Sequence, residues 1–261
     1  LSKKDVRRIC KIINTNTLHK SVESSSKFYD KYSMSYGKEQ RKRKEYFVAI
    51  ERKVSEKMLP GKWLDVGAGD GIRTNRILSS VSGVCAHVLD NSMEMCKLLR
   101  NSNFEEVLTE DISQINESVA KKLESVYDNI TCLYNVLGHI PNYNSRKAAL
   151  INMSKSLKKD RMLFIDVNNR YNIKQYGLIN VVKNILLDIF KKRGRGDFVL
   201  NVKTLNGSLK TLVHIFNKQE LTQLLNSSGF SVQEVVYINY KTGAKERTQF
   251  EGQIFVIAKK K

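Results

Sequence analysis

A glycine turn between an apolar run and a helical pattern constrains the fold of this chain more than any other feature. Residues 63–66 (WLDV) have the character of a buried strand, and residues 67–71 (GAGDG) follow directly. Glycines adopt positive φ and let a ligand approach the backbone, so the turn predicts a binding site at the end of a parallel strand. Its third glycine comes one residue too early for the GxGxxG fingerprint of dinucleotide sites. Asp65, two residues before Gly67, is placed to meet an ammonium group, which a pyrophosphate site would not need.

The rest of the pattern predicts an α/β fold. Residues 62–167 alternate short apolar runs with helical patterns, which is typical of βαβ units in a parallel sheet. The expected strands are 63–66, 84–89, 106–108, 129–134, 162–167, 232–239 and 253–258. The expected helices include 71–79, 92–100, 145–158 and 218–226. We therefore predict a doubly wound, seven-stranded sheet that is mostly parallel, with an antiparallel edge strand.

Residues 168–216 interrupt this pattern. An apolar helical stripe at 178–190 precedes two alternating runs, 198–203 and 208–216, which flank the hairpin signal Asn206-Gly207. Because ligands bind at the carboxyl edge of parallel sheets, we predict a helix-hairpin lid, with a simple edge extension as the alternative. The expected divisions are an N-terminal helical cap (1–60), a ligand-binding core (61–167), the lid (168–216) and a C-terminal completion of the sheet (217–261).

The net charge of +19 is unevenly distributed. Residues 1–60 hold 16 Lys and Arg against 7 Asp and Glu, residues 61–167 hold 13 against 13, and residues 168–216 hold 9 against 2. Charge that is concentrated on the flanks of a neutral core favours an anionic partner. We expect such a substrate to enter under Tyr36 and Tyr171 and to be steered by Lys191, Lys192, Arg193 and Arg195. Lysines that merely decorate solvated faces are the alternative.

Cysteine usage and hydropathy indicate a cytoplasmic protein. The four cysteines show no CxxC spacing and are expected to be reduced packing residues. No apolar run reaches the roughly 18 residues of a membrane span. His19, His87 and His214 have no acidic neighbours at metal-ligand spacing, so no metal site is expected.

Acidic residues at the ends of successive strands identify the ligand class. Asp90 ends the second strand, where a carboxylate can accept from both hydroxyls of a ribose, and Asp111 follows the third, where it can accept from an adenine amino group beside Ile112. Either acid alone would also fit a helix N-cap. Together with Asp65 they describe a nucleoside with a positively charged tail, which is S-adenosyl-L-methionine.

A segment before the glycine turn resembles a known family. Tyr36 lies seven residues before Arg43, and Arg43 lies 22 residues before Asp65. This order resembles class I methyltransferases of the glycine N-methyltransferase-like group, over roughly residues 29–166, and implies their Rossmann-like fold. The resemblance implies that Arg43 holds the methionine carboxylate of the cofactor and that Tyr36 lines the methyl-transfer site. The run RKRK at 41–44 would also fit a solvated helix face.

A second segment, residues 132–141 (CLYNVLGHIP), is similar to the fourth-strand segment of that family. The resemblance implies that Asn135 lies near the substrate and His139 near the reaction centre, although a lone histidine is often structural. The chain then departs from the family, because Arg170 is displaced by two residues from the arginine that binds glycine there, or that role is absent. Glycine is therefore not indicated as the substrate. The expected catalytic residues are His139, Asn135 and Tyr36, and the expected cofactor-binding residues are Arg43, Asp65, Gly67, Ala68, Gly69, Asp90, Asn91, Asp111, Ile112 and Tyr134.

These observations predict methyl transfer to a nitrogen or oxygen of a small polar or anionic molecule. A hydroxyl acceptor would need a general base, for which His139 is the candidate. An RNA substrate is an alternative, although no RNA-binding module is recognisable. A membrane-associated lipid substrate, or a regulatory protein that only binds the cofactor, would also suit the basic amphipathic segment near residues 178–192.

Overall fold

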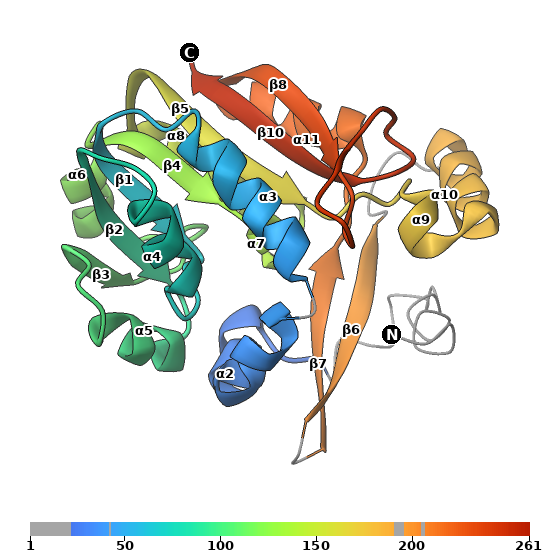
Figure 1. Ribbon diagram of the computed structural model, residues 1–261, viewed down its shortest axis with the longest axis horizontal. Helices are drawn as coiled ribbons and strands as arrows, with labels where there is room; N and C mark the ends of the chain where they lie inside the picture. Colours follow the sequence, from blue (N-terminus) through green and yellow to red (C-terminus); the bar gives the residue numbers. More distant parts are fainter. Residues whose placement is uncertain (1–21, 42, 191–195, 205–206) are drawn as a thin grey trace.

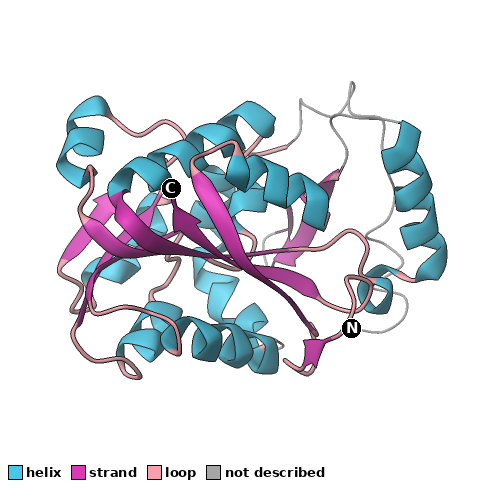
Figure 2. Cartoon of the chain, turned by 90° about the horizontal axis from the view of Figure 1, so that it is seen from above, coloured by secondary structure: helices cyan, strands magenta, loops and turns pink. Residues whose placement is uncertain are grey.

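A twisted eight-stranded sheet carries helices on both faces (Figures 1 and 2). This computed structural model describes residues 22–41, 43–190, 196–204 and 207–261. The strand order is β3-β2-β1-β4-β5-β10-β8-β9. The strands are β1 (Gly61–Val66), β2 (Val84–Asp90), β3 (Glu106–Thr109), β4 (Tyr127–Cys132), β5 (Leu157–Val167), β8 (Phe230–Ile238), β9 (Lys245–Glu246) and β10 (Gln253–Lys260).

The predicted α/β fold is confirmed. Strands β1 to β5 pair in parallel, and β10 runs antiparallel between β5 and β8. The sheet has one strand more than the seven expected, because the two-residue β9 pairs antiparallel with β8. A strand of two residues is too short to show the period-2 alternation on which the sequence argument relied.

Two groups of helices cover the two faces of the sheet. One face packs against α3 (Lys44–Ser55), α4 (Ile72–Leu78) and α5 (Met93–Arg100), and the other against α6 (Glu117–Leu123), α8 (Tyr143–Ser156) and α11 (Lys218–Asn226). In β1, Trp63 faces the first group and Leu64 the second, and both are fully buried. This burial on both faces explains why the parallel strands read as continuous apolar runs.

The expected helix at 145–158 ends earlier than predicted. Helix α8 stops at Ser156, and Leu157 already pairs with Tyr127 of β4 as the first residue of β5. Leu157 is fully buried in the sheet, so tertiary pairing overrides the helical period there.

The insertion contains the predicted helix and hairpin. After α9 (Ile173–Tyr176) come α10 (Leu178–Phe190) and an antiparallel pair, β6 (Asp197–Thr204) and β7 (Gly207–His214). Strand β7 contacts α2 (Ser25–Arg41), whereas α10 lies on the far side of the hairpin (Figure 1). None of the helices in the described ranges is long and apolar enough to cross a membrane.

Helix α2 is docked by polar contacts in its N-terminal half and just before its start. The Asp30 carboxylate accepts from the Ser92 hydroxyl at 2.7 Å and from the Glu94 amide at 3.2 Å, at the start of α5. Before the helix, the Glu23 amide donates to the Lys210 carbonyl in β7. These contacts hold α2 between the sheet and the hairpin.

Candidate active site

A cavity of about 260 Å³ opens at the carboxyl ends of β1, β2 and β4. The sheet contributes the loops that follow these strands and β3, while α2 and β7 close the cavity from outside. The lining residues include Gly67, Gly69, Asp90, Asn91, Asp111, Ile112, Tyr134 and His139 from the sheet loops, with Tyr29, Tyr36, Thr211 and Leu212 from α2 and β7. The topology therefore brings together most of the residues expected at the cofactor.

Neighbouring side chains approach two glycines of the turn closely. Gly67 has a φ of 71°, and a Cβ there would lie 2.5 Å from Cγ2 of Val136. Gly69 has a φ of 61°, and a Cβ there would lie 3.2 Å from Cε1 of Tyr36. A side chain at Gly67 would displace Val136 of the β4 loop. A side chain at Gly69 would press on the Tyr36 ring and would be strained by the positive φ.

The amide groups of the turn are bound within the protein. The amides of Gly67 and Ala68 donate to the Leu89 carbonyl at 2.7 and 3.2 Å, and the Gly69 amide donates to Oδ2 of Asp90 at 2.9 Å. These three amides are therefore not free to donate to a ligand in the cavity. Ala68, expected to bind the cofactor, is buried against α5 and does not line the cavity, which corrects that prediction.

Asp90 lies at the cavity wall, where the sequence predicts a carboxylate that binds the ribose. It is 8 % exposed, and its oxygens each accept one backbone amide, from Gly69 and from Ser92 at 2.9 Å. Burial raises the pKa of Asp90, while the two amides oppose that shift. The amides fix the orientation of the carboxylate and leave lone pairs for hydroxyl donors at the cavity wall.

Asp111 and Ile112 form the neighbouring wall. Oδ1 of Asp111 accepts from the amide and the hydroxyl of Ser113, at 2.8 and 2.7 Å. Oδ2 has no hydrogen-bond partner among the described residues. Ile112 is almost fully buried and belongs to the core beneath the cavity. An apolar side chain beside a carboxylate suits an adenine ring and its amino group.

Asp65 does not reach the cavity, contrary to the sequence-based prediction. Its fully buried carboxylate accepts from Arg73 at 2.9 Å, from the Thr74 hydroxyl at 2.6 Å and from the Thr131 hydroxyl at 2.7 Å. Burial lowers the pKa of Arg73, but the Asp65 carboxylate outweighs it and raises the pKa above the ordinary value. This ion pair leaves Asp65 no capacity to bind a ligand ammonium.

Tyr134 lines the cavity, as expected of a cofactor-binding residue. It adopts a positive φ of 62°, its amide donates to Oδ1 of Asp166 at 2.6 Å, and its hydroxyl donates to Glu51 at 2.8 Å. The guanidinium of Arg73 lies 4.8 Å from its ring centroid, a cation–π contact. The strained backbone is thus held by hydrogen bonds at both ends of the residue.

His139 faces the cavity together with an unanticipated tyrosine. Its Nε2 lies 3.1 Å from the hydroxyl of Tyr29, and its Nδ1 is buried with no partner in the part of the chain that the structure describes. Burial, with a contribution from Arg43, lowers the pKa of His139 to about 4, so the ring is neutral at pH 7. Tyr29 precedes Tyr36 by two helical turns, and this spacing was the available signal for it.

The structure corrects the expectation for Asn135. Its backbone has a φ of 63°, and its side chain is buried away from the cavity. Oδ1 accepts from the Asn168 amide at 2.9 Å, and Nδ2 donates to the His214 carbonyl at 3.4 Å. Both ends of the amide therefore bind backbone, so Asn135 joins the β4 loop to the strand ends and does not face a substrate.

Three further expectations concern positively charged or aromatic groups. Arg43 is exposed and stacks over Tyr240 at 4.9 Å, so its side chain does not line the cavity. Tyr171 donates to Asp188 at 2.7 Å and also lies outside the cavity. The basic run at 191–195, expected to steer the substrate, lies outside the described residues.

The two parts of the insertion, which was predicted to form a lid, lie differently with respect to the cavity. Thr211 and Leu212 of β7 line the cavity, and the Thr211 hydroxyl bonds to the Glu23 carbonyl at 3.3 Å. The helix α10 contributes no lining residue within the described ranges. The hairpin therefore covers the cavity while the helix does not.

A family model described as a methyltransferase domain matches residues 38–235. The chain belongs to this family. The cavity also fits the cofactor: Asp90 can hold the ribose, and Asp111 and Ile112 the adenine, beside the glycine turn that lines the cavity. The protein is a methyltransferase whose cofactor is S-adenosyl-L-methionine.

Solved structures show the same fold. A methyltransferase from Methanosarcina mazei is 19% identical with a TM-score of 0.58, covering 79% of this chain and 96% of that one. The 1,6-didemethyltoxoflavin-N1-methyltransferase of Burkholderia thailandensis is 16% identical with a TM-score of 0.55, covering 89% and 86%. An amino pentose methyltransferase of Micromonospora echinaspora is 14% identical with a TM-score of 0.57, covering 87% and 97%. No curated protein sequence matches the chain.

Asp90 provides a test of cofactor binding. S-adenosyl-L-methionine should raise the melting temperature, because a ligand that binds only the native state stabilises it. Asp90→Ala should remove most of this increment, whereas Asp160→Ala, which changes an exposed acid at the start of β5, should retain it. Differential scanning fluorimetry with and without cofactor measures the increment. An increment retained in Asp90→Ala, or stabilisation by NAD alone, would contradict the assignment.

The Asp65–Arg73 pair provides a test of stability. Arg73→Met leaves a buried carboxylate without its counter-ion and should lower the free energy of unfolding by about 3–5 kcal/mol. The matched control, Lys97→Met, breaks the exposed pair with Glu94 and should cost about 0–1 kcal/mol. Urea denaturation followed by circular dichroism measures both. Equal losses in the two variants would show that Asp65 does not depend on Arg73.

Proposed function

We propose that this methyltransferase transfers a methyl group from S-adenosyl-L-methionine to a nitrogen or oxygen of a small polar molecule. The observation that carries the proposal is the neutral His139, which lies at the wall of the cofactor cavity with Tyr29 on its Nε2. Two proteins of similar fold are described as methyltransferases of 1,6-didemethyltoxoflavin and of an amino pentose, which supports a small-molecule substrate. The finer glycine N-methyltransferase-like grouping stays a prediction.

The residues of the chain mainly align the reactants. The cofactor supplies an electrophilic methyl group on a sulfonium. Asp90 and Asp111 hold the two ends of the adenosine, and the rings of Tyr29 and Tyr36 line the chamber in which the acceptor meets the methyl group. His139 accepts the proton that the acceptor loses, which a neutral imidazole does at ordinary pH. Alignment of this kind supplies much of the rate of a displacement reaction.

The charge of the cavity favours an amine as the acceptor. Among the described lining residues the charged ones are acids: Glu23, Asp90, Glu110 and Asp111. Asp90 and Asp111 serve the adenosine. Oε1 of Glu23 is paired with Lys31, while its buried Oε2 has no hydrogen-bond partner among the described residues. A carboxylate in this position attracts an ammonium group. The anionic substrate expected from the excess of lysine and arginine stays a prediction based on the sequence.

A second candidate is a substrate held at a lipid surface. Helix α10 exposes a row of apolar side chains, with exposed fractions from 45 to 85 %: Leu178, Ile179, Val182, Leu186 and Ile189. An amphipathic helix with such a face is typical of proteins that lie on a membrane interface. A lipid with a polar headgroup would then be the methyl acceptor.

One assay distinguishes these candidates. Isotopically labelled cofactor is incubated with pools of small amines, small hydroxyl compounds, anionic lipid vesicles and structured RNA, and methylated products are identified by mass. The proposal expects labelled product in the amine or hydroxyl pools. Product only in the vesicles would establish the second candidate, and product only in the RNA would overturn both.

His139 sets the expected pH dependence. Because its pKa is lowered to about 4, the base form is present from about pH 5 upward and is lost only as the pH falls toward 4. The kcat of the wild type should therefore show no inflection near pH 6.5 from this residue. His139→Ala should lower kcat by roughly 10²–10⁴-fold without changing cofactor affinity. An inflection near 6.5 that disappears in the variant would show that the imidazole titrates as an exposed group.

A further inference from the structure

Three metal-ligating side chains meet at the end of β2 that lies away from the cofactor cavity. Cys85 and His87 lie two residues apart in β2, so they share one face of the sheet. Glu105 immediately precedes β3, and its amide donates to the Ala86 carbonyl at 3.1 Å. One potential ligand atom from each of the three residues lies within 4.8 Å of the others. The spacing in sequence conceals this group, because strand pairing supplies the glutamate.

His87 presents a ligand atom that is otherwise unexplained. The residue is 6 % exposed, and its Nε2 has no hydrogen-bond partner among the described residues. On the other side of the ring, Nδ1 lies 3.3 Å from Oε2 of Glu106 and 3.1 Å from the Tyr127 hydroxyl. The Glu106 carboxylate favours the tautomer that is protonated on Nδ1, and in that tautomer Nε2 presents a lone pair. Histidines that bind metals are oriented in this way by a carboxylate behind the ring.

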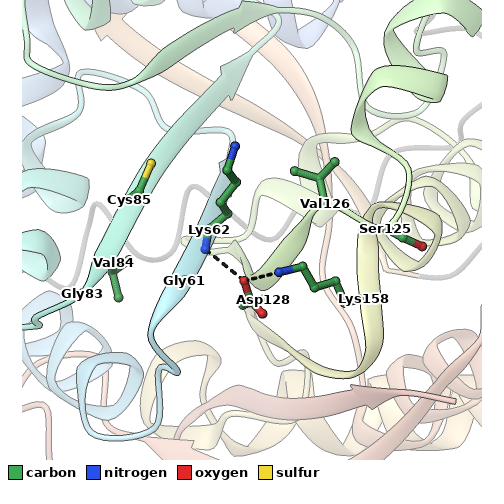
Figure 3. Close-up of a pocket in the computed structure, with 9 residues that line it drawn as sticks. All are labelled: Gly61, Lys62, Gly83, Val84, Cys85, Ser125, Val126, Asp128 and Lys158. Atoms are coloured by element: carbon green, nitrogen blue, oxygen red, sulfur yellow. Dashed lines mark hydrogen bonds and ion pairs between the residues drawn. The ribbon is translucent and has the colours of Figure 1, made fainter.

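The surroundings of Cys85 and His87 carry negative charge, and Cys85 lies beside a hollow in the surface. The Cys85 thiol donates to the Glu105 carboxylate, and Oε1 of Glu105 lies 3.8 Å from Nε2 of His87. Figure 3 shows Cys85 beside Lys62 at the edge of a hollow at this end of the sheet. Lys62 contributes one positive charge, against the two carboxylates of Glu105 and Glu106 and a thiolate once the thiol is deprotonated. Glu106 is also paired with Lys122.

We propose that Cys85, His87 and Glu105 form a binding site for a zinc ion. A thiolate, an imidazole and a carboxylate are all ligands that Zn²⁺ takes in proteins, and three protein ligands leave one tetrahedral position for water. Ligand atoms around tetrahedral zinc lie about 3.4–3.6 Å apart. The three ligand atoms lie within 4.8 Å of one another, and the side chain of Glu105, which is 56 % exposed, can rotate to shorten its 3.8 Å separation from Nε2 of His87. The sequence-based expectation of no metal site is thereby revised.

Cobalt serves as the spectroscopic probe of this site. The full chain is treated with a chelator, desalted and titrated with Co²⁺ and then with Zn²⁺. The proposal expects one Co²⁺ per chain with a near-ultraviolet thiolate-to-cobalt absorption, which Zn²⁺ abolishes by displacement. Zinc should also raise the melting temperature. Absence of the absorption in the wild type would overturn the proposal.

Matched variants assign the ligands. Cys85→Ser should abolish the thiolate absorption and weaken zinc binding by about 100-fold or more, whereas Glu106→Gln, which removes only the group behind the ring, should weaken it by roughly 10–100-fold. Cys10→Ser is the control, because Cys10 lies outside the described residues and could offer a thiol of its own. Absorption that survives in Cys85→Ser, or is lost in Cys10→Ser, would refute the site. Unchanged circular dichroism and unchanged cofactor affinity in Cys85→Ser would show that the variant remains folded.

Discussion

The hydrogen bonds and ion pair of the buried Asp65 carboxylate hold together the cavity end of the sheet. The carboxylate joins the end of β1 to α4 through Arg73 and Thr74, and to β4 through Thr131. Arg73 also donates to the Gly67 carbonyl at 3.2 Å, so the same cation fixes the glycine turn. An ion pair of this kind is costly to bury, and it is tolerated because every partner is supplied by a rigid element. The cofactor site is built beside this pair and does not include it.

The chamber above the cofactor is assembled from segments far apart in the sequence. Helix α2 brings Tyr29 to His139, and β7 brings Thr211 to the carbonyl of Glu23. Each contact joins residues more than one hundred positions apart.

The two ends of β2 carry different chemistry. Its carboxyl end places Asp90 at the cofactor cavity, where strand ends and loops converge. Its amino end places Cys85 and His87 beside Glu105, where the strand pairing between β2 and β3 brings a thiol, an imidazole and a carboxylate together. Side chains on one strand therefore serve two sites, because a strand in the middle of a sheet extends from one edge of the fold to the other.

The sequence by itself determined the α/β fold, the glycine turn and the positions of Asp90, Asp111 and Ile112, because strand periodicity and the convergence of parallel strand ends are local or topological rules. The sequence also predicted that His139 and Tyr36 lie near this site, and both line the cavity. Only the tertiary structure decided that Asp65 forms a buried ion pair with Arg73 instead of facing the ligand. It also decided that the Asn135 side chain binds backbone groups and that Arg43 stacks on Tyr240. It alone showed Tyr29 against His139 and Glu105 beside His87. In each of these cases the direction of a side chain depends on which distant partner satisfies its hydrogen bonds or charge, and residue order does not encode that choice.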